Sequence, residues 1–350
     1  MQSRGEGVGQ MTEGVNEPRV TAWLAERIER IRPPLTFDLI AGGHSNLTYC
    51  VTDANDERWV LRRPPLGHVI ESAHDVAREH RIISALADTD VPVAPAVGVC
   101  TDLGVNGAPF YVMEFVDGIV LNDADAALRL TEAERGRLGD EVIDVLVRLH
   151  AIEPADVGLD DLGRREAYLE RQLRRWTRQW ESTRTRDIPA MEECCRLLGE
   201  RMPEQIGSGI VHGDYRVGNM LVAGGSVLAV LDWELCTLGD PLADLGYLLN
   251  WSVQPGETDA RQADQAPTAV GGFPTREHML ERYARATGRD VSNIAYYRAF
   301  SHWRLAAIGE GVYKRYLVGA MGDQGDQDLT EFADSVVRRA ETALELLNEG

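Results

Sequence analysis

Hydrophobic positions follow two different patterns along the chain. In the first third, apolar stretches at residues 39–51, 58–63 and 108–116 are bounded by Gly, Pro, Asp or Asn, which predicts short strands. From residue 131 onward, apolar residues recur every three or four positions, and the first such run opens with a capping box of Thr131 and Glu134. The pattern therefore predicts an α+β chain whose first part is rich in strands and whose remainder is mostly helical.

One predicted hairpin interrupts the helical remainder. Residues 220–223 and 226–231 are short apolar stretches joined by a Gly-Gly pair, which is the sequence of a two-residue hairpin turn. Pairing the strands about that turn brings Asn219 and Asp232 to the same end of the hairpin, close to Asp214. Two carboxylates and an amide oxygen are hard ligands that suit magnesium rather than zinc. The alternative is a hairpin with polar ends whose acids only cap turns.

The composition is that of a soluble, acidic protein. The 350 residues are 44% hydrophobic and include seven Trp, enough for a large core that we expect to divide into two lobes. A formal charge of −20 argues against nucleic-acid or membrane partners. Five Cys without a Cys-x-x-Cys pair predict neither a zinc site nor a disulfide framework. The sequence shows no leader and no membrane-spanning run, so we expect a cytoplasmic location, with the oligomeric state left open.

The order and spacing of these polar residues resemble the motif of a known family. Asp214, an Asn five residues later, and Asp232 after a strand follow the spacing of kinase phosphoryl transfer. With His212 and Gly213 before Asp214, the motif resembles the aminoglycoside phosphotransferase and choline kinase superfamily. The resemblance implies that Asp214 orients the acceptor hydroxyl and accepts its proton. It also implies that Asn219 and Asp232 hold magnesium on the phosphates of ATP or GTP.

The resemblance further implies a bilobal, protein-kinase-like α+β fold. We expect a disordered tail at residues 1–18, an N-lobe at 19–116 and a C-lobe at 117–350. Only seven residues separate Asp232 from Asp240, the cap of the next helix, too few for the peptide platform of a protein kinase. The partners implied are therefore a nucleotide and a small-molecule hydroxyl acceptor.

A Gly-Gly pair marks a candidate nucleotide loop. Gly42 and Gly43 lie between two apolar stretches, and such a pair lets the backbone approach phosphates closely. In this place the segment resembles the nucleotide loop of the family, with Ser45 and Asn46 at its tip.

The strand that ends near residue 116 resembles the hinge between the two lobes. The resemblance implies that the main chain of Glu114 and Val116 meets the adenine edge, because a paired donor and acceptor suit a flat heterocycle. The alternative is a strand followed by an ordinary turn.

A predicted helix at residues 73–86 carries an acid on its apolar face. Glu79 shares that face by three-four-three spacing, and a buried carboxylate needs a cation. Kinases supply a Lys from the third strand, but the only Lys here is Lys314, and Arg62 stands at that place. We therefore expect Arg62 to pair with Glu79 and to bridge it to the phosphates. The alternative is that Glu79 reaches water.

A basic segment indicates which branch of the family the chain resembles. Residues 164–186 hold eight Arg against three Glu, and the helix at 168–180 keeps its Arg opposite its apolar stripe. The simpler interpretation is a solvated helix face; the alternative is a site for an anionic substrate arm. Together with residues 41–46, 60–65 and 72–74, this segment resembles the kinase-like domains fused to acyl-CoA dehydrogenases in animals, which also occur alone in bacteria.

The acceptor is the least defined part of the prediction. The resemblance to this branch implies a hydroxyacyl-CoA-type acceptor, whereas bacterial members are commonly labelled aminoglycoside phosphotransferases. An aminoglycoside or macrolide antibiotic is therefore the alternative substrate. A nucleotide-binding pseudokinase is the alternative of another class, favoured only by the missing Lys. Residues 254–274, rich in Gly, Pro and Gln, are predicted to form a mobile loop over the acceptor site.

Overall fold

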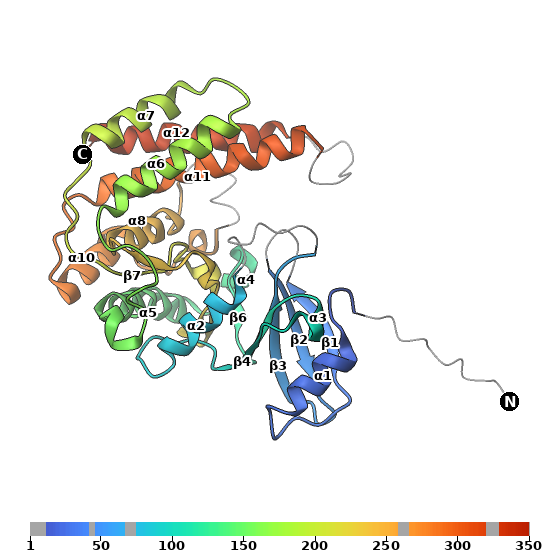
Figure 1. Ribbon diagram of the computed structural model, residues 1–350. Coiled ribbons are helices and arrows are strands. Elements are labelled where there is room, and N and C mark those ends of the chain that lie inside the picture. The colour runs from blue at the N-terminus through green and yellow to red at the C-terminus, as the bar shows by residue number, and fades with distance from the viewer. Residues whose placement is uncertain (1–11, 42–45, 67–74, 258–265, 320–328, 350) are drawn as a thin grey trace. The chain divides into compact units, whose positions relative to one another are not determined.

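The chain folds as two compact units. The computed structural model describes residues 12–41, 46–66, 75–257, 266–319 and 329–349. Unit 1 is Met1–Gly118 with Leu228–Glu234, and unit 2 is Ile119–Val227 with Leu235–Gly350. The predicted α+β class is confirmed, because unit 1 is built on an antiparallel sheet and unit 2 is mostly helical (Figure 1).

The sheet of unit 1 has five antiparallel strands in the order β1-β2-β3-β5-β4. Its strands are β1 (Thr36–Ala41), β2 (Leu47–Thr52), β3 (Arg58–Arg63), β4 (Ala96–Cys100) and β5 (Phe110–Glu114). The register of β3 places Arg62 between Thr48 on β2 and Tyr111 on β5. This central position fixes the side of the sheet on which the Arg62 side chain emerges.

Helices cover the sheet of unit 1. They are α1 (Glu17–Ala25), α2 (Val76–Leu86) and the short α3 (Leu103–Asn106). Trp23 of α1 packs edge-to-face on Phe110 of β5 with ring centroids 5.0 Å apart. Contacts of α2 with β4 and β5 bring Glu79, which is 1% exposed, toward the strands. The expected burial of Glu79 is therefore confirmed.

Residues 12–18 belong to the folded part of unit 1, which corrects the expectation of a disordered tail through residue 18. Val15 is buried, and the Tyr49 hydroxyl donates a hydrogen bond of 2.7 Å to the Glu13 carbonyl oxygen. No hydrophobic period reveals this segment, because main-chain atoms make the contact. The residues before Thr12 lie outside the described part of the chain.

Unit 2 is a helical assembly with two small sheets. Its helices are α4 (Ala124–Leu128), α5 (Glu132–Ala151), α6 (Tyr168–Thr183), α7 (Pro189–Glu200), α8 (Leu242–Trp251), α10 (Arg276–Thr287), α11 (Ile294–Leu317) and α12 (Thr330–Glu349). The long helices α11 and α12 pack side by side, and α6 and α8 also pack on α11 (Figure 1). None of the described helices is long and apolar enough to cross a membrane.

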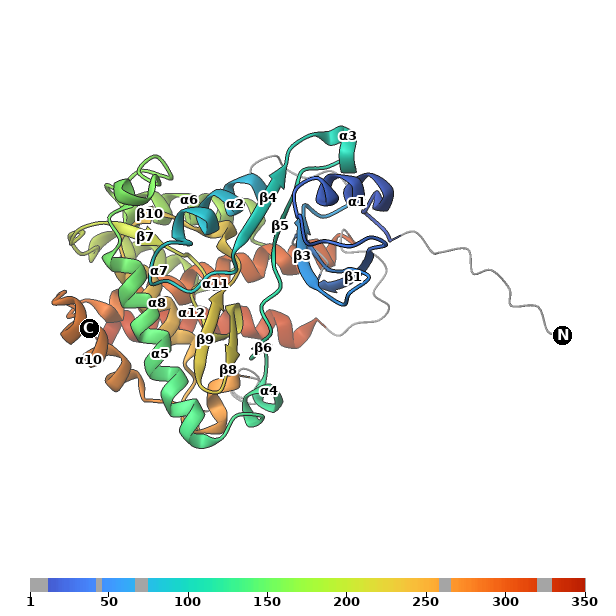
Figure 2. The ribbon, with the colours of Figure 1, turned by 90° about the horizontal axis from the view of Figure 1, so that it is seen from below.

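Two small sheets flank the segment from Asp214 to Asn219. β7 (Gly209–Val211) pairs with β10 (Thr237–Gly239), and β6 (Ile119–Val120), β8 (Met220–Ala223) and β9 (Ser226–Val230) form a three-stranded sheet in the order β6-β8-β9 (Figure 2). Gly224 and Gly225 have φ angles of 57° and 87°, as a hairpin turn of this length requires. The predicted hairpin is therefore confirmed.

Candidate active site

Asp244 holds the loop that carries Asp214 through hydrogen bonds to the loop main chain. This acid at the start of α8 accepts hydrogen bonds from the main-chain N–H groups of His212 at 2.6 Å and Gly213 at 2.8 Å. Asp244 is 1% exposed, and His150 Nε2 lies 3.5 Å from it. A buried carboxylate with a main-chain donor on each oxygen fixes the backbone that precedes Asp214. Asp244 is therefore a structural acid of this loop.

Gly213 is required by both conformation and space. Its φ angle is 87°, in the left-handed region. A Cβ atom at this position would lie 2.8 Å from the Leu235 carbonyl oxygen. Any larger residue would therefore displace the loop that carries Asp214.

The two oxygens of Asp214 have different environments. Asn219 Nδ2, in the 3-10 turn η2 (Val217–Asn219), donates to Asp214 Oδ2 at 2.7 Å and to its carbonyl oxygen at 2.8 Å. Asp214 Oδ1 is buried and accepts no hydrogen bond, although Arg216 Nε lies 3.5 Å away. One oxygen is thus held by Asn219, and the other has no hydrogen-bond donor. Because both amide hydrogens of Asn219 point to Asp214, its Oδ1 remains for a cation.

Two further residues contact this loop that the sequence did not reveal. The Tyr247 hydroxyl hydrogen-bonds the Asp214 carboxylate, and burial, followed by the Asp214 charge, raises the pKa of Tyr247, which therefore stays a donor. Arg304 Nη2 donates to the Gly213 carbonyl oxygen at 2.9 Å, and its guanidinium lies 5.0 Å from the centroid of the Tyr247 ring. Tyr247 follows Asp244 by three residues on α8, a spacing that could have placed it. Arg304 lies far along the chain and gave no local signal.

Within unit 1, Arg62 contacts two acids. Its Nη2 lies 2.6 Å from Asp232 Oδ1, and its Nε lies 3.3 Å from Glu79 Oε2, so the expected ion pair with Glu79 is present. Burial alone would lower the pKa of Arg62, but attraction to Glu79, Tyr111 and Asp232 raises it. Arg62 is therefore a fixed cation despite its burial.

Glu79 receives two further hydrogen bonds. Asn46 Nδ2 donates to its Oε1 at 2.5 Å, and the Tyr111 hydroxyl donates to its Oε2 at 3.2 Å. Burial raises the pKa of Glu79 in spite of these partners, because the charged form is poorly solvated. Of the predicted loop residues, only Asn46 is described, and its side chain points inward; Gly43 and Ser45 lie outside the described residues.

Asp232 has an unusual backbone conformation. Its φ angle of 65° lies in the left-handed region, which few non-Gly residues adopt. The indole N–H of the next residue, Trp233, donates to the Val230 carbonyl oxygen at 3.0 Å and holds the turn. Non-Gly residues in this region cluster at functional sites, where the surrounding structure enforces them.

The end of β5 and the residues after it carry the main-chain groups that the sequence predicts at the adenine edge. The Glu114 N–H donates to the Pro95 carbonyl oxygen at 2.9 Å, so it is already engaged. The Glu114 side chain forms an ion pair with Arg30. Among the described residues, the main chain of Val116 makes no such bond, which leaves its N–H open.

The polar residues fit magnesium better than other metals. The described residues contain no group of three or more His, Cys, Asp or Glu side chains arranged to hold an ion. Magnesium needs no such group, because it is bound through one or two protein oxygens together with nucleotide phosphates. The open Oδ1 of Asn219 and the Asp232 carboxylate are oxygen donors of that kind.

Within unit 2, two guanidinium groups lie beside the loop that carries Asp214, in addition to the Asp244 carboxylate that holds it. No second carboxylate contacts Asp214 among the described residues, while Arg216 and Arg304 lie beside its loop. On α6, an open depression of about 550 Å³ is lined by Arg171, Arg174, Arg175, Arg178, Gln179 and Ser182. The guanidinium groups of Arg175 and Arg304 lie 5.1 and 6.0 Å from the Trp176 ring centroid.

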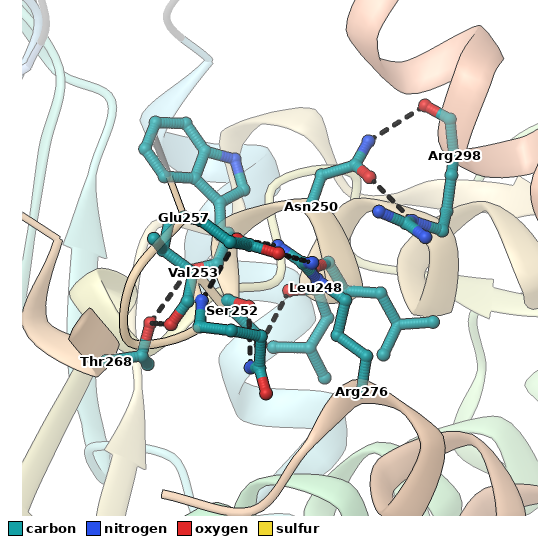
Figure 3. Close-up of polar contacts among 11 residues, drawn as sticks. Leu248, Asn250, Ser252, Val253, Glu257, Thr268, Arg276 and Arg298 are labelled. Atoms are coloured by element: carbon teal, nitrogen blue, oxygen red, sulfur yellow. Dashed lines mark hydrogen bonds and ion pairs between the residues drawn. The ribbon is translucent and has the colours of Figure 1, made fainter. Parts of the chain in front are cut away.

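The segment that follows α8 is anchored at both described ends (Figure 3). Arg276 pairs with the Glu257 carboxylate through Nη2 at 2.7 Å, and the Thr268 hydroxyl donates to the Val253 carbonyl oxygen at 2.9 Å. These bonds restrain the described residues of the predicted loop at 254–274. Its central part, residues 258–265, lies outside the described residues.

Similarity to known proteins agrees with this geometry. Residues 36–291 match the phosphotransferase enzyme family. Acyl-CoA dehydrogenase family member 10 of Mus musculus is 37% identical over 303 residues, covering 85% of this chain and 28% of that protein. Acyl-CoA dehydrogenase family member 11 of Gallus gallus is 34% identical over 313 residues, covering 87% of this chain and 40% of that protein. The chain thus spans well under half the length of these relatives.

Solved structures of similar proteins have the same fold as this chain. A protein from Ralstonia eutropha, provisionally named an aminoglycoside phosphotransferase, is 32% identical with a TM-score of 0.79, over 96% of this chain and 99% of that one. An aminoglycoside phosphotransferase in complex with AMP-PNP and hygromycin B is 15% identical with a TM-score of 0.61, over 93% and 98% of the two chains, and shows the fold alone. With the Asp214 motif, the Arg62–Glu79 pair and the family match in agreement, the chain belongs to the phosphotransferase enzyme family and is a small-molecule kinase that acts on hydroxyl groups.

Proposed function

We propose that this kinase transfers the γ-phosphoryl group of ATP to a hydroxyl group on a small molecule with an anionic arm, with a hydroxyacyl-CoA-type compound as the favoured acceptor. The observation that carries the proposal is the pair of unequal oxygens on Asp214. Asn219 fixes Oδ2 at 2.7 Å, and the buried Oδ1 has no hydrogen-bond donor of its own. A carboxylate held in this way is suited to receive a hydroxyl proton.

Unit 2 supplies the groups that act on the hydroxyl. Asp214 Oδ1 accepts a hydrogen bond from the acceptor hydroxyl and takes its proton as the new oxygen–phosphorus bond forms. The bond between the γ-phosphorus and the bridging oxygen breaks, and ADP leaves. Asn219 of unit 2 and Asp232 of unit 1 are the residues that we assign to magnesium, which when bound would neutralise charge on the phosphates. Tyr247 and Asn219 keep the Asp214 carboxylate oriented throughout.

Unit 1 supplies the groups that bind the nucleotide. Arg62, held by Glu79, is the cation for the phosphates, and Asn46 ties the start of β2 to the same acid. The proposed loop contacts also include Gly43 and Ser45. The adenine edge would meet the carbonyl oxygen of Glu114 and the open N–H of Val116. GTP is the alternative nucleotide, because main-chain contacts alone discriminate weakly between the two bases.

Local charge favours an anionic acceptor. An aminoglycoside carries several positive charges and needs carboxylates around Asp214, whereas Arg216 and Arg304 lie there in unit 2. The four Arg of the α6 depression suit the phosphates of a CoA arm. The similarity to acyl-CoA dehydrogenase family members supports the same acceptor class. An aminoglycoside or macrolide stays the alternative, supported by the name of the Ralstonia protein.

Transfer of labelled phosphate from ATP across an acceptor panel tests the proposal. The panel is a hydroxyacyl-CoA, its free hydroxy acid, kanamycin and a macrolide, each with magnesium and with Asp214→Asn as the blank. Faster transfer to the CoA compound than to the antibiotics supports the proposal. Faster transfer to an antibiotic would contradict it and support the alternative, an aminoglycoside or macrolide acceptor. Nucleotide binding without transfer to any compound would favour a pseudokinase. The feature of the sequence that favours a pseudokinase is Arg62 in place of the usual Lys.

A further inference from the structure

Arg304 is a cation beside the catalytic loop without an acidic partner. It projects from α11, donates through Nη2 to the Gly213 carbonyl oxygen at 2.9 Å, and lies against the Tyr247 ring. Among the described residues, no carboxylate lies within ion-pair distance of it. Other guanidinium groups in unit 2 are neutralised directly: Arg276 by Glu257 and Arg282 by Asp144.

The guanidinium of Arg304 also has an unused donor. Its Nε is buried and has no hydrogen-bond partner. A buried donor on a charged group that stays unpaired is strongly destabilising, so proteins usually fill such a position. The residue as a whole is only partly buried, so part of its side chain is exposed to solvent.

Residues near Arg304 also present an unpaired donor and a positive charge. The Trp251 indole N–H is buried without a partner, and the Arg216 guanidinium lies 4.9 Å from the Trp251 ring centroid. The rings of Trp251 and Tyr247 are 6.1 Å apart, so the aromatic groups form one continuous wall. Unfilled donors and cations on an aromatic wall are what an oxyanion needs.

We propose that Arg304 is the acceptor-binding cation of this site and receives a carboxylate or phosphate group carried by the acceptor. This inference rests on the proposed function and deepens it, because it assigns an anionic group of the acceptor to a residue beside the Asp214 loop as well as to the α6 depression. Arg304 Nε is the donor that the anion completes, and Arg216 Nε lies 3.5 Å from Asp214 Oδ1. Anionic acceptors are therefore selected over neutral analogues.

Two matched pairs of acceptors separate charge from shape. The first pair is 3-hydroxybutanoate and 3-hydroxybutanamide, and the second is glycerol 3-phosphate and glycerol. We expect kcat/KM to favour the anionic member of at least one pair, and the pair affected tells whether a carboxylate or a phosphate fits. Arg304→Gln should abolish this preference by raising KM about tenfold or more for the anion and by clearly less for its neutral partner, whose kinetics report the loss of the Gly213 contact alone. Arg304→Lys should restore part of it.

A control variant and a binding measurement make the test independent of turnover. Arg315→Gln removes an exposed Arg from the same helix and should leave the preference intact. Calorimetric titration with inorganic phosphate and with 3-hydroxybutanoate should show weaker binding to Arg304→Gln than to Arg315→Gln. If transfer occurs but Arg304→Gln slows anionic and neutral acceptors equally, Arg304 only supports the loop and the inference is wrong while the kinase function stands. If the anion binds through Arg304 but no acceptor is phosphorylated, the anion site stands and the proposed function fails.

Discussion

Arg62 Nη2 lies 2.6 Å from Asp232 Oδ1, so the cation that replaces the usual kinase lysine contacts the acid that we assign to magnesium. The same guanidinium contacts Glu79 through Nε at 3.3 Å, so one side chain neutralises two acids of unit 1. Magnesium and a guanidinium would compete for the Asp232 carboxylate. Under this assignment we expect binding of the metal nucleotide to draw Arg62 from Asp232 toward the phosphates.

Replacing Arg62 tests this role. We expect Arg62→Ala to raise the KM for ATP about tenfold or more, because a charged hydrogen bond contributes roughly 1.5–3 kcal/mol. Arg63→Ala is the matched control: Arg63 donates to the Pro64 carbonyl oxygen at 2.9 Å and faces the other side of the strand, so it should lower the melting temperature rather than change KM. An equal rise in KM for both variants would show that Arg62 has no specific role.

Tyr111 should matter through Glu79 rather than through packing alone. Tyr111→Phe keeps the ring in β5 and removes the donor to Glu79 Oε2, leaving that oxygen only the contact with Arg62. We expect a loss of about 1 kcal/mol in the free energy of unfolding and a higher KM for ATP with little change in kcat. Urea unfolding and steady-state kinetics measure the two effects. A fall in kcat alone would contradict this assignment.

Substitutions of Asp214 and Asp232 should have different effects on transfer and on nucleotide binding. Asp214→Asn should reduce kcat by a factor of about 100 or more while ATP binding changes little, because Asp214 meets the hydroxyl and not the nucleotide. Asp232→Ala should weaken binding of magnesium ATP as well, because it removes a metal ligand. Fluorescent nucleotide titration with and without magnesium distinguishes these results. Equal losses of binding would argue against separate roles.

The hairpin and the order of the catalytic residues could be predicted because they depend on local signals. A Gly-Gly turn, apolar strands and fixed spacing place Asp214, Asn219 and Asp232 without knowledge of the tertiary structure. The Arg62–Glu79 contact was also predictable, because a carboxylate on an apolar helix face needs a cation.

The remainder of the site depends on contacts between distant segments. Arg304 reaches Gly213 from α11, and no helix period distinguishes it from other Arg of that helix. Asn46 was expected to face the nucleotide, yet its side chain is buried against Glu79. The order of residues 12–18 was missed for a related reason, because main-chain groups hold that segment. Polar contacts of this kind leave no pattern in a single sequence.

Acid sensitivity should depend on His302. Burial, then Arg339, Arg298 and Arg276, lowers the pKa of His302 to about 3. Below about pH 6.5 the unfolded chain binds a proton at this His that the folded chain does not, so stability falls as the pH falls from about 6.5 to 3, by up to about 1.4 kcal/mol per pH unit. His302→Gln should flatten this part of the stability curve in urea unfolding at pH 7, 6 and 5. A variant with the same slope as the original chain would contradict the assignment.

The basic face of α6 should affect the acceptor and not the nucleotide. Arg175 and Arg178 line the depression, and Arg175 lies 5.1 Å from the ring centroid of Trp176, which also contacts Arg304. Changing both Arg to Glu should raise the KM for a CoA-linked acceptor about tenfold or more and leave that for ATP nearly unchanged. The matched control reverses two exposed Arg elsewhere in unit 2, Arg285 and Arg315, and alters net charge equally. Because salt screens charge beyond about 8 Å at physiological ionic strength, a long-range effect would appear in both double variants and vanish at high salt, whereas direct contact affects only the α6 variant.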